Sequence, residues 1–581
     1  RKKQVKRYKK YIMPYWVCFV LGPVGMIIEV LGEVFLPWFL SQIQDKGIVN
    51  EDVTFIVGIG ICMIITAICM AAGGIMGAYY ASKAAMSFGA DLRLDIFKKI
   101  QQFSFKNIDE FSTGSLVTRL TNDITQVQNL IMLFLRLCLR APGMLIGALI
   151  MAFVMNAKLA IVILVVIPIL VAAISIIIKI GYPRFELMQK KIDRLNSGIQ
   201  ESLVNIRVIK SFVRSDFEEE KFQKLNKDLK ETSMRAFKVV IFNMPVMMLA
   251  MNITTIAVVW FGGNMIVAGT MTVGDLMAFT TYIVQILMSL MMLAMVFLNS
   301  SRAMASLKRI TEVLDKEIDL TDENASCKNR DVEDGSVEFR NVKYRYYKDS
   351  SEWVLNDINV RIKAGQTVGI IGPTGCGKST LVSMIPRLYD VDEGEVLVDG
   401  VNVKDYSLRN LREGVGMVLQ KNVLFSGDIM ENLRWGDENA SDEEVFEVSK
   451  RAQAHDFVMA FPDQYRTELG QGGSNVSGGQ KQRLCIARAL LKKPKILILD
   501  DSTSAVDTAT EAKIRETFST SLKNATKIII AQRITSVMDA DQILVMEDGR
   551  IVDQGVHSEL MERCVEYREI YDSQMRREVT A

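Results

Sequence analysis

The chain of 581 residues is poor in the side chains that usually build disulfide frameworks and metal sites. It has only two histidines, His455 and His557, and its eight cysteines are scattered with no C-x-x-C pair. This spacing favours reduced, unpaired thiols over disulfides or a metal centre. An excess of one charge is also missing, because 69 Lys and Arg residues stand against 67 Asp and Glu residues. Bulk charge therefore argues against a nucleic-acid partner.

Neither a cleavable signal peptide nor a low-complexity tract is found in the sequence. The length predicts two or more domains. Hydrophobic residues make up 49% of the chain, and they concentrate in its first half. A polar, acid-rich segment at 311–335 reads as a linker. We therefore expect a transmembrane domain at 1–310, this linker, and an α/β domain at 336–581.

Six apolar stretches are long enough to span a membrane, because a hydrocarbon core of ~30 Å takes roughly 20 apolar residues. Six crossings return the chain to its starting side. The basic segment Arg1–Lys10 predicts that this side is cytoplasmic, by the positive-inside rule. The predicted spans are 15–40, 54–80, 129–154, 158–180, 239–268 and 274–299.

The two inward-facing connections, 81–128 and 181–238, are long, charged and patterned as helices, whereas the outward loops are short. Each inward connection has a break, at Asn107–Gly114 and near Asn205–Ser211. Paired helices of ~25 residues would project roughly 40 Å into the cytoplasm. We expect the breaks to form short helices that touch a cytoplasmic domain.

Two arginines, Arg136 and Arg140, lie one helical turn apart inside the third stretch. A charge there is costly unless it faces a cavity or a partner. The pair indicates either a polar translocation path or side chains that snorkel from a differently placed span, and the sequence leaves both open.

Methionines cluster in the fifth and sixth stretches. Flexible thioethers suit surfaces that accept varied apolar ligands, although lipid contact or core packing is the role expected for most of these methionines. The clustered residues are Met244, Met247, Met248, Met251, Met288, Met291, Met292 and Met295.

A phosphate-binding loop opens the second half of the chain. The apolar strand Thr367–Ile371 runs into Gly372-Pro-Thr-Gly-Cys-Gly-Lys-Ser379 and then into a predicted helix, which is the context that the G-x-x-x-x-G-K-S motif requires. Backbone N–H groups of this loop can surround phosphates. Lys378 should reach the β- and γ-phosphates, and Ser379 should hold Mg²⁺.

Further motifs follow in order. Asp500 ends the strand Ile496–Asp500, as a magnesium-orienting aspartate should. Tyr346, which we expect before the first core strand, can stack on adenine. The sequence also contains Gln420, Ser477-Gly-Gly-Gln480 and Ser504-Ala-Val-Asp507.

Residues 336–575 resemble the ATP-binding cassette of ABC transporters, and the whole chain resembles an exporter half-transporter. The resemblance implies a six-helix, all-α transmembrane domain of the type I (also called type IV) exporter fold, followed by an α/β P-loop cassette with a helical subdomain. It also implies ATP and Mg²⁺ as cofactors. The implied nucleotide-binding residues are Tyr346, Gly372, Thr374, Gly375, Cys376, Gly377, Lys378, Ser379, Thr380, Gln420 and Asp500, of which Ser379, Gln420 and Asp500 hold the metal.

Other roles follow from the same resemblance. Ser477, Gly478, Gly479 and Gln480 would act on ATP held by a partner chain. Ser504 and Asp507 would form the D-loop, and position 532 would be the switch. The tips near 107–117 and 203–212 would be coupling helices.

Two departures from the family pattern concern hydrolysis. Asp501 stands where a hydrolysing cassette has Glu, and Gln532 stands where it has His. Asp501 is one methylene shorter, and a general base has to lie within hydrogen-bond reach of its proton. Gln532 carries neither the proton nor the charge of an imidazole. Val476, in place of the usual Leu, and Gln471, where many homodimeric exporters place Glu, are milder departures.

Together these features resemble the degenerate-site subunit of a heterodimeric, multidrug-type ABC exporter. The resemblance implies an ATPase coupled to transport, a competent partner chain, a lipid bilayer and an amphipathic or hydrophobic small-molecule substrate. It implies a bacterial inner-membrane protein with its N-terminus and cassette in the cytoplasm. The alternatives are a slow homodimeric exporter, an exporter of lipid, haem or peptide, and an ATP-gated regulatory membrane module.

Overall fold

The computed structural model describes residues 2–347, 351–501 and 506–580. The chain divides into two compact units. The first comprises Arg1–Lys99 and Gly114–Asp315, and the second comprises Ile100–Thr113 and Lys316–Ala581.

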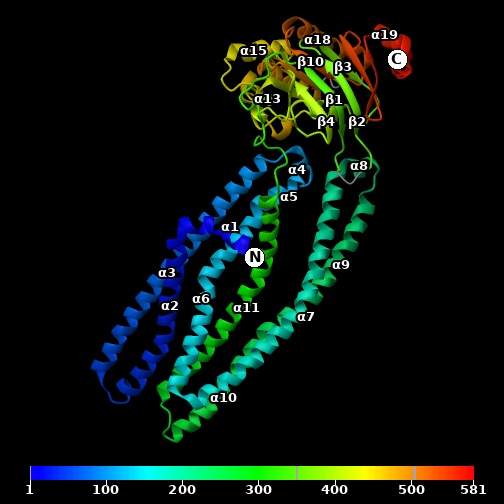
Figure 1. The fold of residues 1–581 in the computed structure, drawn as a ribbon. Coiled ribbons are helices and arrows are strands. Elements are labelled where there is room, and N and C mark those ends of the chain that lie inside the picture. The colour runs from blue at the N-terminus through cyan, green and yellow to red at the C-terminus, as the bar shows by residue number, and fades with distance from the viewer. Residues whose placement is uncertain (1, 348–350, 502–505, 581) are drawn as a thin grey trace. The chain divides into compact units, whose positions relative to one another are not determined.

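The first unit is helical (Figure 1). Its long helices follow from the apolar stretches and from the charged, helix-patterned connections between them. The helices that lie mainly in this unit are α1 (Lys2–Ile12), α2 (Trp16–Gln42), α3 (Val53–Gln101), α5 (Thr113–Thr118), α6 (Ile124–Met155), α7 (Ala157–Val204), α8 (Ile206–Ser211), α9 (Ser215–Ile241), α10 (Asn243–Val267) and α11 (Val273–Asp315).

Within the described residues, six helical stretches are long and apolar enough to cross a membrane, as the sequence predicts. α6 packs along α11 and α2, whereas α7 packs along α9. The core among α2, α6, α7, α10 and α11 contains the fully buried Phe279 and Tyr282. The six stretches are Arg7–Ile48, Val53–Gln101, Thr113–Met155, Ala157–Val204, Met248–Val267 and Val273–Leu293.

Both predicted breaks form short helices. α4 (Phe105–Asp109) is capped by Ser104, whose side chain accepts a hydrogen bond from the Asn107 N–H. α8 (Ile206–Ser211) separates α7 from α9. The predicted start of the linker at 311 is wrong, because α11 continues to Asp315. Ile310 and Val313 are fully buried on α11, so its helical spacing of apolar residues extends into the acidic segment.

Close contact between α2 and α3 depends on glycine. An added Cβ on Gly25 would lie 2.5 Å from the Gly73 carbonyl oxygen and 2.6 Å from the Gly77 nitrogen. Small residues at membrane-helix contacts let backbones approach in this way. Because both neighbours are backbone atoms, only a shift of the helices could relieve the clash.

We therefore expect Gly25→Ala to destabilise the protein by about 1–3 kcal/mol, as overpacking does. The measurement is the midpoint of thermal unfolding in detergent. Gly58→Ala is the matched control, because nothing lies within 4 Å of its added Cβ and α3 is helical there. Equal midpoints for the two variants would contradict the importance of this contact.

The second unit contains two main sheets. One has four antiparallel strands in the order β2-β1-β4-β5, and the other has six strands in the order β12-β11-β3-β10-β9-β6. All neighbours in the second sheet are parallel except β12 and β11. β7 and β8 pair separately. The strands are β1 (Val337–Tyr344), β2 (Leu355–Ile362), β3 (Thr367–Ile371), β4 (Glu393–Val398), β5 (Val401–Asn402), β6 (Val415–Val418), β7 (Gly427–Asp428), β8 (Glu468–Leu469), β9 (Ile496–Asp500), β10 (Thr526–Ile530), β11 (Gln542–Glu547) and β12 (Arg550–Gly555).

Helices surround these sheets, and a separate helical core lies among α14, α15 and α17. The helices are α12 (Lys378–Ser383), α13 (Leu408–Gly414), α14 (Ile429–Arg434), α15 (Asp442–Arg451), α16 (His455–Met459), α17 (Gly478–Leu491), α18 (Thr508–Ser521), α19 (His557–Arg563) and α20 (Val565–Thr580).

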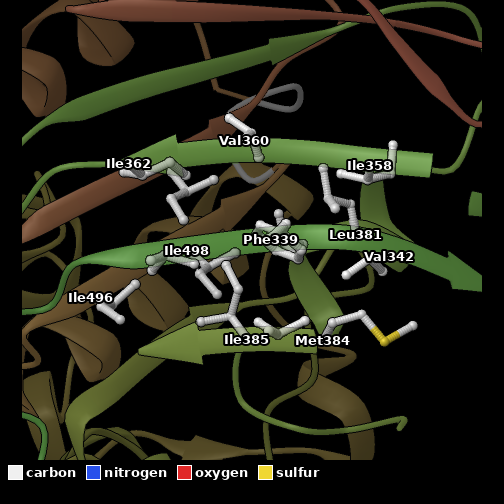
Figure 2. Close-up of a cluster of buried hydrophobic side chains, with 14 of the residues drawn as sticks. Phe339, Val342, Ile358, Val360, Ile362, Leu381, Met384, Ile385, Ile496 and Ile498 are labelled. Atoms are coloured by element: carbon white, nitrogen blue, oxygen red, sulfur yellow. The ribbon is translucent and has the colours of Figure 1, made fainter. Parts of the chain in front are cut away.

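The main core of this unit fixes the helix that follows the phosphate-binding loop. Figure 2 shows Leu381 of α12, with Met384 and Ile385 just after it, among side chains of β1, β2 and β9. Val382 is also fully buried. Because both sheets hold α12, the loop before it has a fixed anchor.

Candidate nucleotide site

Three parallel neighbours of the six-stranded sheet, β3, β10 and β9, end at the same edge. The phosphate-binding loop follows β3, Asp501 follows β9, and Gln532 lies just after β10. Ligands of open α/β sheets bind at the carboxyl ends of the strands. The topology therefore gathers the predicted site residues from three separate segments.

The backbone of the phosphate-binding loop adopts a conformation that favours glycine. Gly377 has φ +97°, and a Cβ there would lie 2.8 Å from the Val354 carbonyl oxygen. The Lys378 ammonium donates hydrogen bonds to the carbonyl oxygens of Gly372 at 2.8 Å and Pro373 at 2.7 Å. Thr374 and Gly375 are exposed, whereas Cys376 and Thr380 are buried. The ammonium group is thus held directly against the loop that is expected to receive phosphate.

Two of the three predicted magnesium ligands, Ser379 and Asp500, meet. The Ser379 hydroxyl donates a hydrogen bond of 2.9 Å to the Asp500 carboxylate. Burial raises the pKa of Asp500, the neighbouring Asp501 charge raises it further, and the Ser379 hydrogen bond opposes both. A cation at this position would favour the charged carboxylate, so the donor set fits Mg²⁺.

The two residues that differ from the family pattern, Asp501 and Gln532, are hydrogen-bonded to each other. The Gln532 side-chain amide donates a hydrogen bond of 2.7 Å to Asp501 Oδ2. Asp501 is buried, its N–H donates to the Ile530 carbonyl, and its φ of +48° is a left-handed conformation that Asp adopts more readily than most residues. One carboxylate oxygen at the predicted base position therefore already accepts an amide proton.

A residue that the sequence did not point to holds the switch segment. Gln574 of α20 donates to the Gln532 carbonyl oxygen at 2.8 Å and accepts from the Ile534 N–H at 2.8 Å. Both backbone groups flank Arg533, so this one side chain fixes the course of the segment. No sequence spacing links residue 574 to residue 532, and only the fold could reveal the contact.

Neither histidine replaces the missing switch imidazole. His455 Nδ1 lies 3.0 Å from the Tyr465 hydroxyl, and His557 Nδ1 lies 2.8 Å from the Tyr567 hydroxyl. Among the described residues, neither has a hydrogen bond with Asp501 or Gln532.

Tyr346 differs from its expected position. It follows β1 rather than preceding the first core strand, because an antiparallel strand comes before the nucleotide-binding sheet. Its hydroxyl lies 3.0 Å from the Thr380 hydroxyl, which places it beside the start of α12. The ring is 38% exposed, so one part of it can still stack on a base.

Tyr389 connects this tyrosine to α4. Its ring centroid lies 5.5 Å from that of Tyr346 and 6.1 Å from that of Phe105. Its hydroxyl donates a hydrogen bond of 3.2 Å to Asp109 of α4. The first break in the chain, as α4, therefore contacts the α/β domain. Tyr389 carries no motif that would have identified it beforehand.

The signature motif, Ser477-Gly-Gly-Gln480, lies at the start of α17. Ser477 caps α17: its hydroxyl accepts from the Gln480 N–H at 3.3 Å, and the Gln480 side chain accepts from the Ser477 N–H at 2.8 Å. Ser477 and Gly478 are exposed, and Gly479 is partly buried. The helix N-terminus is thereby preformed and accessible, as phosphate binding requires.

Two further predicted residues, Gln420 and Asp507, are exposed. Gln420 is exposed, and within the described residues no hydrogen bond joins its side chain to Ser379 or Asp500. Asp507 is exposed and caps α18 by accepting from the Thr510 N–H at 2.9 Å, which holds the pKa of Asp507 below its usual value. Ser504 lies outside the described residues.

Comparison with known proteins agrees with this architecture. Residues 19–290 match the family described as ABC transporter transmembrane region, and residues 355–504 match the family described as ABC transporter. The chain is 41% identical to "Uncharacterized ABC transporter ATP-binding protein YfiB" of Bacillus subtilis, with 98% of each chain covered.

Two further relatives have more specific names. "Putative multidrug export ATP-binding/permease protein YgaD" of Bacillus subtilis is 32% identical over 98% of this chain and 99% of its own length. "ATP-dependent lipid A-core flippase" of Desulfotalea psychrophila is 30% identical, with 99% and 100% covered.

Among solved structures, a bacterial Atm1-family ABC exporter with ATP bound has a TM-score of 0.78 and 26% identity, and the match covers 97% of this chain and 98% of that one. The predicted fold class is confirmed by this similarity together with the six apolar helices and the α/β domain. The chain therefore belongs to the ABC transporter family, as a multi-pass exporter-type member with its transmembrane region and ATP-binding domain fused.

Proposed function

We infer that this chain is one half of a heterodimeric exporter, and that its own ATP site binds nucleotide but hydrolyses it poorly. The observation that carries the proposal is the hydrogen bond from Gln532 to Asp501, because it occupies an oxygen of the carboxylate at the predicted base position. A carboxylate whose side chain is one methylene shorter, and which already accepts a hydrogen bond from an amide, is a weak base for water.

The remaining residues supply binding rather than hydrolysis. Ser379, Gln420 and Asp500 would hold Mg²⁺, and bound Mg²⁺ would neutralise phosphate charge. Lys378 and the loop amides would hold the phosphates, Thr374 and Thr380 would line the loop, and Tyr346 would stack on adenine. Asp507 and Ser504 would contact the partner cassette. Ser477 to Gln480 would complete the partner's competent site.

Transport follows from the paired cassettes. ATP closes them and the membrane helices open outward; hydrolysis in the partner's site resets the cycle. We propose that the membrane is a bacterial inner membrane with the cassette in the cytoplasm. The similarity to proteins named for multidrug export and for lipid A-core flipping supports an amphipathic or hydrophobic substrate, with lipid as the second candidate.

The test is the steady-state ATPase activity of this chain purified alone in lipid with saturating Mg-ATP. We expect tight ATP binding with little turnover, and ATP-driven accumulation of an amphipathic dye in inverted vesicles only when a partner chain is present. Brisk turnover by the chain alone would contradict the degenerate site and favour a homodimer. ATP binding without accumulation of dye or lipid in the complex would favour a regulatory module.

A further inference from the structure

Three membrane helices meet at a partly buried polar junction, which we define by Glu29 and Glu33 of α2, Arg140 of α6 and Gln285 of α11. All four residues lie inside candidate membrane spans. Arg140 pairs with Glu29 at 3.0 Å and with Glu33 at 2.8 Å. Ionisable groups at membrane depth are costly, and they mark functional sites by default.

The position of Gln285 has a local cause. Pro37 has no N–H, so it leaves the carbonyl oxygen of Glu33, four residues earlier, without its helical donor. The Gln285 side-chain amide donates a hydrogen bond of 2.8 Å to that oxygen. This bond fixes the amide orientation and leaves the Gln285 side-chain oxygen as an acceptor only.

The junction has more acceptors than it uses. Glu33 Oε2 and the Gln285 side-chain oxygen are buried without a hydrogen-bond partner among the described residues, as is Arg140 Nε. Two carboxylates also face a single arginine. Arg136, one turn away on α6, is exposed, and the described residues contain no ion pair between it and Glu29 or Glu33.

The junction can be reached from the surface of the chain. The side chains of Glu29, Glu33 and Arg140 are 17%, 23% and 20% exposed, respectively. A buried acceptor without a donor is costly, and a ligand that brings N–H groups to such acceptors recovers that cost. Any ligand that enters at this depth also needs apolar parts that tolerate hydrocarbon.

We propose that this junction binds the head group of amphipathic amines in their protonated form, with Glu33 and Gln285 accepting hydrogen bonds from the ammonium N–H groups. The proposal rests on the proposed function, because it names the chemical class of the transported compound. The site would recognise the N–H donors of the ligand as well as its charge, so a quaternary ammonium group should bind less well than a protonated amine.

The test uses the full chain in lipid nanodiscs and three ligands with the same alkyl tail: dodecylamine, dodecyltrimethylammonium and dodecanol. We expect equilibrium binding above that of empty nanodiscs for the amine, weaker binding of the quaternary ion, and the weakest binding of the alcohol. Glu33→Gln should weaken amine binding roughly tenfold or more, the usual effect of removing a charged hydrogen-bond partner. Glu33→Asp should retain part of it.

Asp275→Asn is the matched control, because Asp275, like Glu33, is a carboxylate, and it lies on α11 about 15 Å from Gln285 along the helix. It should leave amine binding unchanged. Equal binding of amine and alcohol by the wild-type chain would overturn the proposal without any variant, and so would unchanged amine binding in Glu33→Gln.

The amine site and the exporter function can be contradicted by different results. ATP-driven export of a neutral probe by a complex that binds no amine would overturn the amine site and keep the exporter. Donor-dependent amine binding with no ATP-driven transport of any probe would keep the site and overturn the proposed function.

Discussion

Changing Asp501 to Glu together with Gln532 to His is expected to raise ATP turnover at this chain's own site by roughly 10²-fold, since a misplacement of about 1 Å costs that much. Glu restores the reach of the carboxylate, and His removes the amide that donates to Asp501 at 2.7 Å. Gln574 would still hold the backbone at residues 532 and 534, so the new imidazole would be held in place.

The single substitutions should each give less than the pair, and their effects should not add, because both act on the attack of the same water. Phosphate release by the assembled transporter in lipid is the measurement. Asp539→Glu is a suitable control, since it makes the same chemical change at an exposed position. Unchanged turnover in the double variant would mean that these two residues do not limit the site.

Gly478→Asp is expected to lower the turnover of the assembled transporter by roughly 10²- to 10³-fold, the range found when a transition-state donor is lost. The added carboxylate would stand at the exposed N-terminus of α17, where the partner's γ-phosphate is expected. Like charges would repel there. The helix itself should tolerate the change, because an acidic residue in the first turn suits the helix dipole.

This loss should appear in phosphate release while ATP binding to the chain's own phosphate-binding loop stays the same. Val476→Leu serves as the control; it restores the common family residue beside the signature and should be nearly silent. Full turnover in Gly478→Asp would show that this signature completes no hydrolysing site.

The sequence predicted the features that depend on local patterns. Apolar runs identified the six spans, and the strand–loop–helix context identified the loop that ends at Ser379. The meeting of Ser379 with Asp500 followed from motif order and is found in the structure. The predicted end of α11 was too early, because the acidic composition of residues 311–335 outweighed the helical spacing of the buried Ile310 and Val313.

Contacts between distant residues could not be predicted in this way. Gln574 and Tyr389 belong to no motif, and each acts through residues far away in the sequence. The ion pairs of Arg140 were equally out of reach: one of the two alternatives for this arginine was a polar path, but the sequence did not identify its partners. Of the methionine clusters, the side chains of Met244 and Met247 lie outside the described part of the chain.

The carbonyl oxygen that Pro37 leaves free also limits how the membrane helices can move. Gln285 satisfies the Glu33 carbonyl, and Tyr282, also on α11, donates to the Val34 carbonyl at 2.8 Å. Separating α2 from α11 would leave a polar backbone group in hydrocarbon without its hydrogen-bond donor, at a cost of several kcal/mol. We therefore expect α2 and α11 to travel as one rigid pair, so that spin labels on the two would keep a constant separation in every nucleotide state, and any hinge or gate would have to open along a different helix boundary.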